Sequence, residues 1–321
     1  MATLQRGSTG TDVTRTEIRL KELKLYDKGI DDSFGPGLEA AVKAFQQKNG
    51  LPATGIVDDA TRAALFRDPS PSLAAMQGKP LAFRCLALTA GFETGTGVPD
   101  CFCGLAGSFD GQGVSFGVLQ WNLGQGTLQP MLQRLNQQHP QTVKAAFGAS
   151  YDAFCGVLSK GKTDQLAWAN TIQDAGHRVQ EPWKSAFRAL GRTQECQDAQ
   201  VAGAADRYAT GLKMCEEYGL WSERAAALMF DIVVQNGSIK AETKQQILAD
   251  FKAIPATASK EDQEVQRMRI VARRRAAAAN PKFSADVLSR KLTCAEGVGV
   301  VHGAGYDLER QFGIRLVPFQ A

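Results

Sequence analysis

The segment from Leu88 to Gln129 constrains the fold of this chain more than any other. It begins inside an apolar run, 81–92, and that run ends at an acid, Glu93. Glycine then recurs throughout the segment. So much glycine weakens a fold unless the backbone must turn sharply or approach a ligand closely. We therefore expect the segment to form a binding or catalytic surface, and the rest of the chain to support it.

Two acids in this segment have contrasting surroundings. Glu93 follows an apolar helix, where burial would raise the pKa of its carboxyl group, whereas Asp110 lies among polar turn residues and would stay ionised. Glycosidases use two carboxyl groups in this way, one as general acid and one as base. We predict these roles for Glu93 and Asp110. The alternatives are a solvated acid at a helix end for Glu93, and an ordinary Asp-Gly turn for Asp110, with Asp100 as a competing second acid.

Further polar and aromatic residues are candidates for contact with a sugar. Gln120, Trp121 and Asn122 end a short apolar segment, and an indole ring can stack on a pyranose face. Trp121 is otherwise a core residue. Gln235 and Asn236 end an apolar helix and are substrate-binding candidates as well. Their alternative is a helix C-cap completed by the next glycine.

Composition describes an ordinary globular chain of 321 residues, with 44% hydrophobic and 22% charged residues. The net charge of +4 is too small to indicate a nucleic-acid partner. The run Arg273-Arg274-Arg275 would be spread around a helix, with one side chain turned toward a carboxylate and two solvated. His302, between glycines, is expected to be structural. We predict no nucleic-acid binding, no membrane insertion and a monomer.

The N-terminus has neither a basic segment nor an apolar one, so no signal peptide is expected. The seven cysteines are an odd number, which fits synthesis in a reducing cytosol, and no histidine lies at metal-ligand spacing from them. We expect most of the thiols to be buried, with no zinc site and no cofactor.

Residues 1–66 read as a small helical module. Val13, Ile18 and Leu20 begin one apolar stripe, and a second helix ends at Asn49-Gly50. A third helix follows, with Asp58 or Asp59 as its N-cap. Three short helices leave little room for a catalytic core.

Four motifs in this module resemble the three-helix peptidoglycan-binding module found in many cell-wall hydrolases. They are Leu4-Gln-Arg-Gly7, Asp32-Ser-Phe-Gly-Pro-Gly37, Ala41-Val-Lys-Ala-Phe-Gln46 and Asn49-Gly-Leu-Pro-Ala-Thr-Gly55. The resemblance implies a wall-anchoring role, carried by Asp32, Phe34, Gly35, Phe45, Gln46 and Thr54. A helical module that binds another protein is the alternative.

Residues 67–80 form a linker by composition, with prolines at 69 and 71. From residue 81 to residue 321 the pattern is almost entirely helical, and only 108–121 indicates short strands. The predicted fold class is α+β and mostly α: the three-helix module, then a lysozyme-like helical domain with a small β-hairpin region.

Three motifs resemble the lysozyme superfamily. Asp110-Gly-Gln-Gly-Val-Ser-Phe-Gly117 resembles the turn that carries the second acid in its chitosanase branch, and Phe230-Asp-Ile-Val-Val-Gln-Asn-Gly237 resembles a helix end of that branch. Ser115 to Gln120 is also similar to a strand of lytic transglycosylases. The resemblance implies that Ser115 helps to position the attacking water. The sequence departs from the chitosanase pattern at Gln112, Val114 and Asn236.

Together these features resemble modular phage endolysins and bacterial wall-degrading effectors. The expected activity is hydrolysis of the glycan strand of peptidoglycan, after release through a phage-made lesion or a secretion machine. Three alternatives stay open: a lytic transglycosylase that uses Glu93 alone, a chitosanase, and an inactive wall-binding protein.

Overall fold

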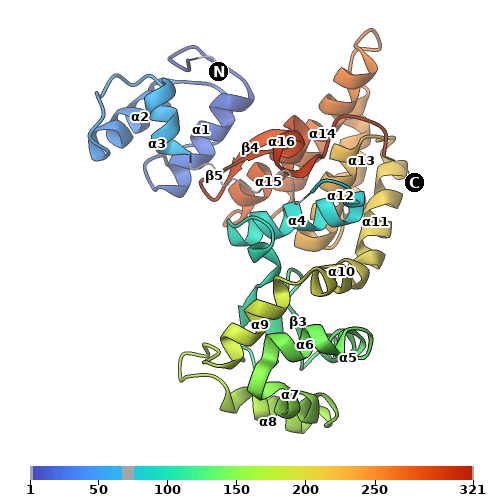
Figure 1. The fold of residues 1–321 in the computed structure, drawn as a ribbon. Coiled ribbons are helices and arrows are strands. Elements are labelled where there is room, and N and C mark those ends of the chain that lie inside the picture. The colour runs from blue at the N-terminus through green and yellow to red at the C-terminus, as the bar shows by residue number, and fades with distance from the viewer. Residues whose placement is uncertain (1–2, 67–75, 320–321) are drawn as a thin grey trace. The chain divides into compact units, whose positions relative to one another are not determined.

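The computed structural model of the chain describes residues 3–66 and 76–319 (Figure 1). Residues 67–75 of the predicted linker lie outside the described residues. The chain forms two compact units: unit 1 is Met1–Leu73 with Thr210–Ala321, and unit 2 is Ala74–Ala209. The predicted glycosidase segment 81–321 contributes to both units, and the domain division drawn from the sequence stays a prediction.

The N-terminal module of unit 1 contains the three predicted helices, α1 (Thr11–Glu22), α2 (Pro36–Lys48) and α3 (Asp59–Leu65). Pro36 begins α2, where its missing N–H and fixed φ favour a helix start. Asp58 is the N-cap of α3, since its side chain accepts the Thr61 N–H at 2.8 Å. The three-helix architecture is therefore confirmed.

The module has its own hydrophobic core, built around Phe34, Val42 and Phe45. Beside that core, the buried Gln46 amide closes the module. Its Nε2 donates to the Ile56 carbonyl at 2.8 Å, and its Oε1 accepts the Gly55 N–H at 2.9 Å. A fully paired buried amide stabilises and specifies a small core.

The C-terminal part of unit 1 is helical with one β-hairpin. Its elements are α12 (Glu223–Asn236), α13 (Ala241–Phe251), α14 (Lys260–Ala277), α15 (Ser284–Glu296), β4 (Val298–Val301), β5 (Ala304–Asp307) and α16 (Leu308–Phe312). The boundary between the units falls inside α11 (Ala205–Glu217).

A buried charge cluster links α12 and α15. Asp231 pairs with Arg290 at 2.6 Å and with Lys291, and all three side chains are almost fully buried. Burial alone would raise the pKa of Asp231, but the two cations outweigh it and lower that pKa to about 2. Removing one partner would leave an uncompensated buried charge, so the cluster fixes how the two helices pack.

Unit 2 is also mainly helical. Its elements before the boundary are α4 (Leu81–Thr94), η2 (Asp100–Phe102), β1 (Leu105–Ala106), β2 (Ser115–Phe116), β3 (Trp121–Asn122), α5 (Leu128–Gln138), α6 (Pro140–Phe147), η3 (Gly148–Ser150), α7 (Tyr151–Leu158), α8 (Lys162–Thr171), α9 (Trp183–Gly191) and α10 (Gln194–Gly203).

The three short strands form one antiparallel sheet in the order β1-β2-β3. β2 lies inside the segment 108–121 where the sequence indicated strands, β3 begins at the last residue of that segment, and β1 precedes it. With helices as the bulk of both units, the predicted fold class, mostly α with a small β region, is confirmed.

Several smaller expectations can be compared with the structure. All seven cysteines are free, and all but Cys155 are buried. His302 lies in the β4–β5 turn at φ 49°, with Nε2 2.7 Å from Asp286, which is a structural position as expected. In the arginine run, two side chains pair with carboxylates where one was expected: Arg273 with Asp32 at 3.0 Å, and Arg274 with Asp250 at 2.6 Å.

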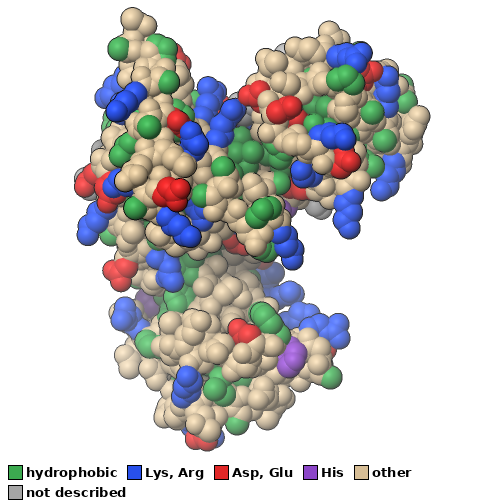
Figure 2. All heavy atoms as spheres, turned by 180° about the vertical axis from the view of Figure 1, so that it is seen from behind, with side chains coloured by type: hydrophobic (Ala, Val, Ile, Leu, Met, Phe, Trp, Pro, Cys, Tyr) green, Lys and Arg blue, Asp and Glu red, His purple; other side chains and the backbone are tan. Residues whose placement is uncertain are grey.

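Basic and acidic side chains are interspersed over the face drawn in Figure 2. None of the helices in the described ranges is both long and apolar enough to span a bilayer. Within the same ranges, no three His, Cys, Asp or Glu side chains gather closely enough to hold a metal ion.

The buried carboxyl group of Glu17 makes the module sensitive to pH. Its oxygens accept the Tyr26 hydroxyl at 3.3 Å and the Asp32 N–H at 3.2 Å. Burial raises the pKa of Glu17 to about 7. A raised folded-state pKa means that the folded module holds its proton more tightly than the unfolded chain. Stability is then greatest at acidic pH and falls as the pH rises from about 4.5 through 7.

We predict that the unfolding free energy of Glu17→Gln, relative to that of wild type, is higher at pH 8 than at pH 5. The gain should be at least ~1 kcal/mol, since a displacement of one pKa unit is worth ~1.4 kcal/mol. Urea unfolding of residues 1–66, followed by circular dichroism at both pH values, measures the difference. Any pH-independent cost of the substitution is the same at both pH values, so it cancels when the two differences are compared.

Glu39→Gln is the matched control, because its hydrogen bond from Lys43 lowers the pKa of Glu39 and leaves it ionised at both pH values. If the unfolding free energy of Glu17→Gln differed from that of wild type by the same amount at both pH values, the raised pKa of Glu17 would be contradicted.

Candidate functional site

Glu93 lies in the last turn of α4, a helix whose residues 85–92 are all buried. Gly95 ends the helix in the left-handed conformation at φ 65°, and its N–H bonds the Gly91 carbonyl at 2.8 Å. The Glu93 side chain itself is exposed. The expectation of a buried acid is therefore wrong for this structure. The helix is buried as predicted, but it ends at the surface, and Glu93 is on its last turn.

Asp110 is exposed in the loop between β1 and β2. Its Oδ1 accepts the Gln112 N–H at 3.0 Å, which is the Asx turn favoured by an Asp-Gly pair. The local geometry of Asp110 is therefore the turn given as the alternative. The hydrogen bond of that turn uses one of the two carboxylate oxygens. Its role as a base stays a prediction.

A second loop fixes the loop that carries Asp110. The Ser108 N–H donates to Gln173 Oε1 at 2.7 Å, and Gln173 follows α8. Gly107 packs against the same loop so closely that an added Cβ would lie 2.2 Å from the His177 carbonyl oxygen. Glycine is thus required here for close backbone approach, as the glycine-rich pattern predicted.

Ser115 and Asn122 share one face of the small sheet, because they are register partners on β2 and β3. Both are nearly buried. Asn122 Oδ1 accepts the Gln125 N–H at 2.8 Å, so its side chain holds the turn after β3. This contact gives Asn122 a structural role, and its place in a sugar subsite stays a prediction. The role of Ser115 in holding a water stays a prediction.

Trp121 belongs to the opposite face of the sheet, with Phe116 as its register partner. Its side chain is 8% exposed and is part of the hydrophobic core of unit 2. Most of the ring is packed in that core, and its remaining surface lines a hollow of about 470 Å3 together with Thr127 and Arg134. Contact of Trp121 with a sugar stays a prediction. Gln120 lies in the β2–β3 turn at φ 51°, and its amide donates to the Gly117 carbonyl at 2.8 Å.

Gln235 and Asn236 end α12 in unit 1. The Gln235 amide is used on both sides: it accepts from Lys291 Nζ and donates to Asp286, each at 2.7 Å. The following Gly237 is the C-cap at φ 78°. The helix-end alternative therefore describes this motif, and the expected contact of Gln235 with substrate is not supported.

The six residues named for the wall-binding module differ in what they can contact. Phe34, Phe45 and Gln46 are buried and hold the module together, so they act through the fold and do not face a ligand. Asp32 is ion-paired with Arg273, and Gly35 is the N-cap of α2. The Thr54 hydroxyl accepts from Gln46 at 3.1 Å.

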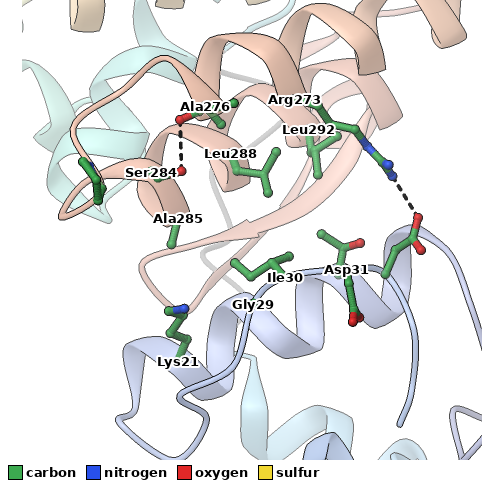
Figure 3. Close-up of a pocket in the computed structure, with 14 residues that line it drawn as sticks. Lys21, Gly29, Ile30, Asp31, Arg273, Ala276, Ser284, Ala285, Leu288 and Leu292 are labelled. Atoms are coloured by element: carbon green, nitrogen blue, oxygen red, sulfur yellow. Dashed lines mark hydrogen bonds and ion pairs between the residues drawn. The ribbon is translucent and has the colours of Figure 1, made fainter.

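Unit 1 also contains a hollow of about 450 Å3, lined by the 29–32 loop, α14 and α15 (Figure 3). Ile30, Leu288 and Leu292 give it an apolar lining, and the Arg273–Asp32 ion pair lies at its edge. Its two acidic side chains come from adjacent positions, 31 and 32, so it lacks the separated acids that glycoside cleavage requires.

Unit 2 contains a hollow of about 440 Å3 that the sequence analysis missed. Phe109, next to Asp110, lines it together with Lys184 and Arg188 of α9. A signal was present: residues 184 and 188 are one helical turn apart, opposite the apolar residues 186, 187 and 190. An aromatic residue immediately before the candidate base was a second signal.

The thiols near this region are unsuited to nucleophilic catalysis. Burial raises the pKa of Cys103 to about 11 and that of Cys196 to about 12. Both thiols stay protonated at neutral pH, whereas a cysteine nucleophile reacts as the thiolate. Neither of these two thiols is therefore a candidate nucleophile.

Residues 9–65 match the sequence family described as putative peptidoglycan binding domain. The resemblance inferred for the module is confirmed. A spore cortex-lytic enzyme from Bacillus cereus is 38% identical over 64 residues, which are 20% of this chain and 25% of that enzyme. The chain thus spans about a quarter of the length of the curated relatives it matches.

Among solved structures, the native chitosanase from Bacillus subtilis MY002 is similar, with a TM-score of 0.43 and 16% identity over 71% of this chain and 98% of that one. A GH46 chitosanase from Gynuella sunshinyii, in complex with chitotetraose, has a TM-score of 0.39 and 12% identity over 68% and 86%. At these values the likeness carries no argument about activity, substrate or site residues.

We predict that Gly107→Ala separates the loop that carries Asp110 from the loop after α8. The added methyl group would meet the His177 carbonyl and Gln173 Oε1, at a cost of ~1–3 kcal/mol typical of overpacking. Amide hydrogens of residues 107–113 should exchange faster, and the unfolding free energy of unit 2 should fall.

Gly156→Ala in α7 is the control, because nothing lies within 4 Å of its added Cβ. That variant should be neutral or more stable by up to ~1 kcal/mol. Equal stability of the two alanine variants would show that the loops are not locked through Gly107.

Proposed function

We propose that this protein cleaves the glycan strand of peptidoglycan by hydrolysis, with Glu93 as general acid and Asp110 as general base. The observation that carries the proposal is the setting of the two acids. Both are exposed in unit 2, one at the end of a buried helix and one on a loop locked to its neighbour. The match of residues 9–65 to a peptidoglycan-binding family supports the choice of polymer.

In this mechanism Glu93 donates its proton to the glycosidic oxygen as the bond to the anomeric carbon breaks. A glycan strand lying over Glu93 would exclude water from the carboxyl group and bring the glycosidic oxygen within hydrogen-bond reach of it. The buried helix behind it holds the group in place.

Asp110 removes a proton from the water that attacks the anomeric carbon on the opposite face. One of its oxygens is held by the Gln112 N–H, so the rigid loop fixes the direction of the other. The proposal assigns Ser115 to holding the water, by its resemblance to the chitosanase motif. Such a water needs a carboxyl separation of about 6.5–9.5 Å, and the product is then inverted at the anomeric carbon.

The runner-up is a lytic transglycosylase, and the Asx turn at Asp110 favours it. A carboxylate committed to a turn need have no other role, and a transglycosylase uses one acid/base residue. Glu93 would then act alone, with a hydroxyl group of the substrate as nucleophile. An inactive wall-binding protein is the alternative outside enzymes.

The N-terminal module is proposed to hold the enzyme on the wall. Tethering raises the local concentration of bonds to cleave without changing the chemistry. The wall lies outside the cytosol, so the proposal also requires that the protein reach it.

We predict that Glu93→Gln and Asp110→Asn each lower the rate of wall lysis by ~10²-fold or more, the usual contribution of a general acid or base. An amide has the same shape as the carboxyl group but can neither donate the catalytic proton nor accept one. Clearing of a purified cell-wall suspension measures the rate, and both variants should still pellet with the walls.

Asp164→Asn is the control, since Asp164 is an exposed carboxylate in the first turn of α8 of the same unit. It should lyse walls at the wild-type rate. Lysis by Glu93→Gln within about tenfold of wild type would remove Glu93 as the acid. Loss of activity in Glu93→Gln alone would favour the transglycosylase.

A further inference from the structure

The 440 Å3 hollow of unit 2 collects positive charge beside the Asp110 loop. His177 and Arg178 line it from the loop after α8, and Lys184 and Arg188 line it from α9. Phe109 lines it from the Asp110 loop itself. We refer to this site as the basic hollow.

The cations of the basic hollow are incompletely neutralised. Arg178 pairs with Asp174 at 2.9 Å. Among the described residues, Lys184 and Arg188 form no ion pair. Glu181 interacts electrostatically with both cations. A hydrogen bond from Ser185 is the main cause that lowers the pKa of Glu181, and the charges of Lys184 and Arg188 lower it further. No acidic side chain lines the hollow within the described ranges. Two like charges facing one solvent-filled space favour an anionic ligand.

Phe109 adds an apolar surface to this charge. Its side chain is 70% exposed, one of the few large hydrophobic residues of the described chain that are not covered. An exposed ring can pack against the C–H face of a sugar. Phe109 directly precedes Asp110 in the sequence, and contacts through Gln173 and Gly107 hold the loop that carries both residues.

We propose that the basic hollow binds a carboxylate borne by the glycan strand, next to the bond that is cleaved. The inference rests on the proposed function and names its substrate class: an anionic glycan. Peptidoglycan carries such carboxylates on its stem peptides, and on its lactyl groups where the peptide has been removed. Chitosan is a polycation, and Lys184 and Arg188 would repel it. The hollow is therefore a specificity-determining site that selects peptidoglycan over chitosan.

The test compares the wild-type chain with a double variant, Lys184→Gln/Arg188→Gln, on two substrates. One is soluble peptidoglycan glycan chains with free carboxylates, and the other is the same material with its carboxylates converted to neutral amides. Wild type should show a KM about tenfold higher on the amidated substrate, the scale of two exposed ion pairs, with little change in kcat. The double variant should show that higher KM on both substrates.

Lys144→Gln/Lys160→Gln is the matched control, because it removes the same charge from exposed lysines of unit 2 that do not line the hollow. It should behave as wild type. The proposal is overturned if the Lys184/Arg188 variant keeps the wild-type KM on the native substrate, or if amidation raises its KM as much as it does for wild type.

A second readout separates this proposal from the proposed function. Hydrogen exchange is measured on the full chain with soluble disaccharide-peptide fragments of peptidoglycan, with and without amidation. Protection of residues 176–188 by the native fragment alone supports the basic hollow, even if wild type releases no products and the proposed function fails. If the protein cleaves the strand but shows no such protection, the proposed carboxylate binding at the basic hollow is wrong and the proposed hydrolase function still holds.

Discussion

The hydrogen bond from the Ser108 N–H to Gln173 Oε1 fixes the geometry on which the candidate site depends. It joins two loops that are far apart in the sequence, and the bare Gly107 backbone lets them touch. Without this contact, only bonds made within 108–124, such as the Gly113 N–H to Ser108 Oγ at 2.9 Å, would restrain the glycine-rich loop of Phe109 and Asp110. With it, a carboxylate, an aromatic ring and the cations of α9 belong to one surface. A catalytic carboxylate needs this kind of support, because an error of an ångström in position costs rate.

The interiors of the two units combine hydrophobic packing with buried polar groups that are matched to partners. In unit 1, buried polar groups are matched to partners: Gln46 within the module, and Asp231 with Arg290 and Lys291 between α12 and α15. An arrangement that separates these partners leaves a buried polar group or charge unpaired, which costs stability. In unit 2 aliphatic side chains surround an aromatic cluster, in which Phe147 and Phe154 stack at 3.9 Å between ring centroids. The chemistry-bearing residues lie at its surface.

Local patterns in the sequence predicted the helices, the small sheet and the module, because apolar periodicity and cap residues act over a few positions. Asp58 as an N-cap and the buried run before Glu93 are of this kind. The exposure of Glu93 could not be read in this way, since it depends on where a buried helix meets the surface. The same limit applies to Trp121, whose burial follows from sheet register and from the helices that cover it.

Long-range contacts explain the remaining differences. Nothing near Gln235 in the sequence indicates that Lys291 and Asp286 use its amide, and nothing near Asp110 indicates Gln173. The basic hollow needed the fold as well, although the spacing of Lys184 and Arg188 carried part of the signal. Residue type and spacing indicated the two acids, whose roles stay predictions, while the positions of the residues around them required the structure.

Mass spectrometry of the products released from purified peptidoglycan by the full chain tests the central claim most directly. Two-carboxylate hydrolysis predicts fragments that end in a free reducing sugar, heavier by one water than the products of a transglycosylase. Fragments that end in an anhydro sugar would contradict the account of Asp110 and leave Glu93 as the sole acid/base. An intact polymer would contradict the enzyme itself.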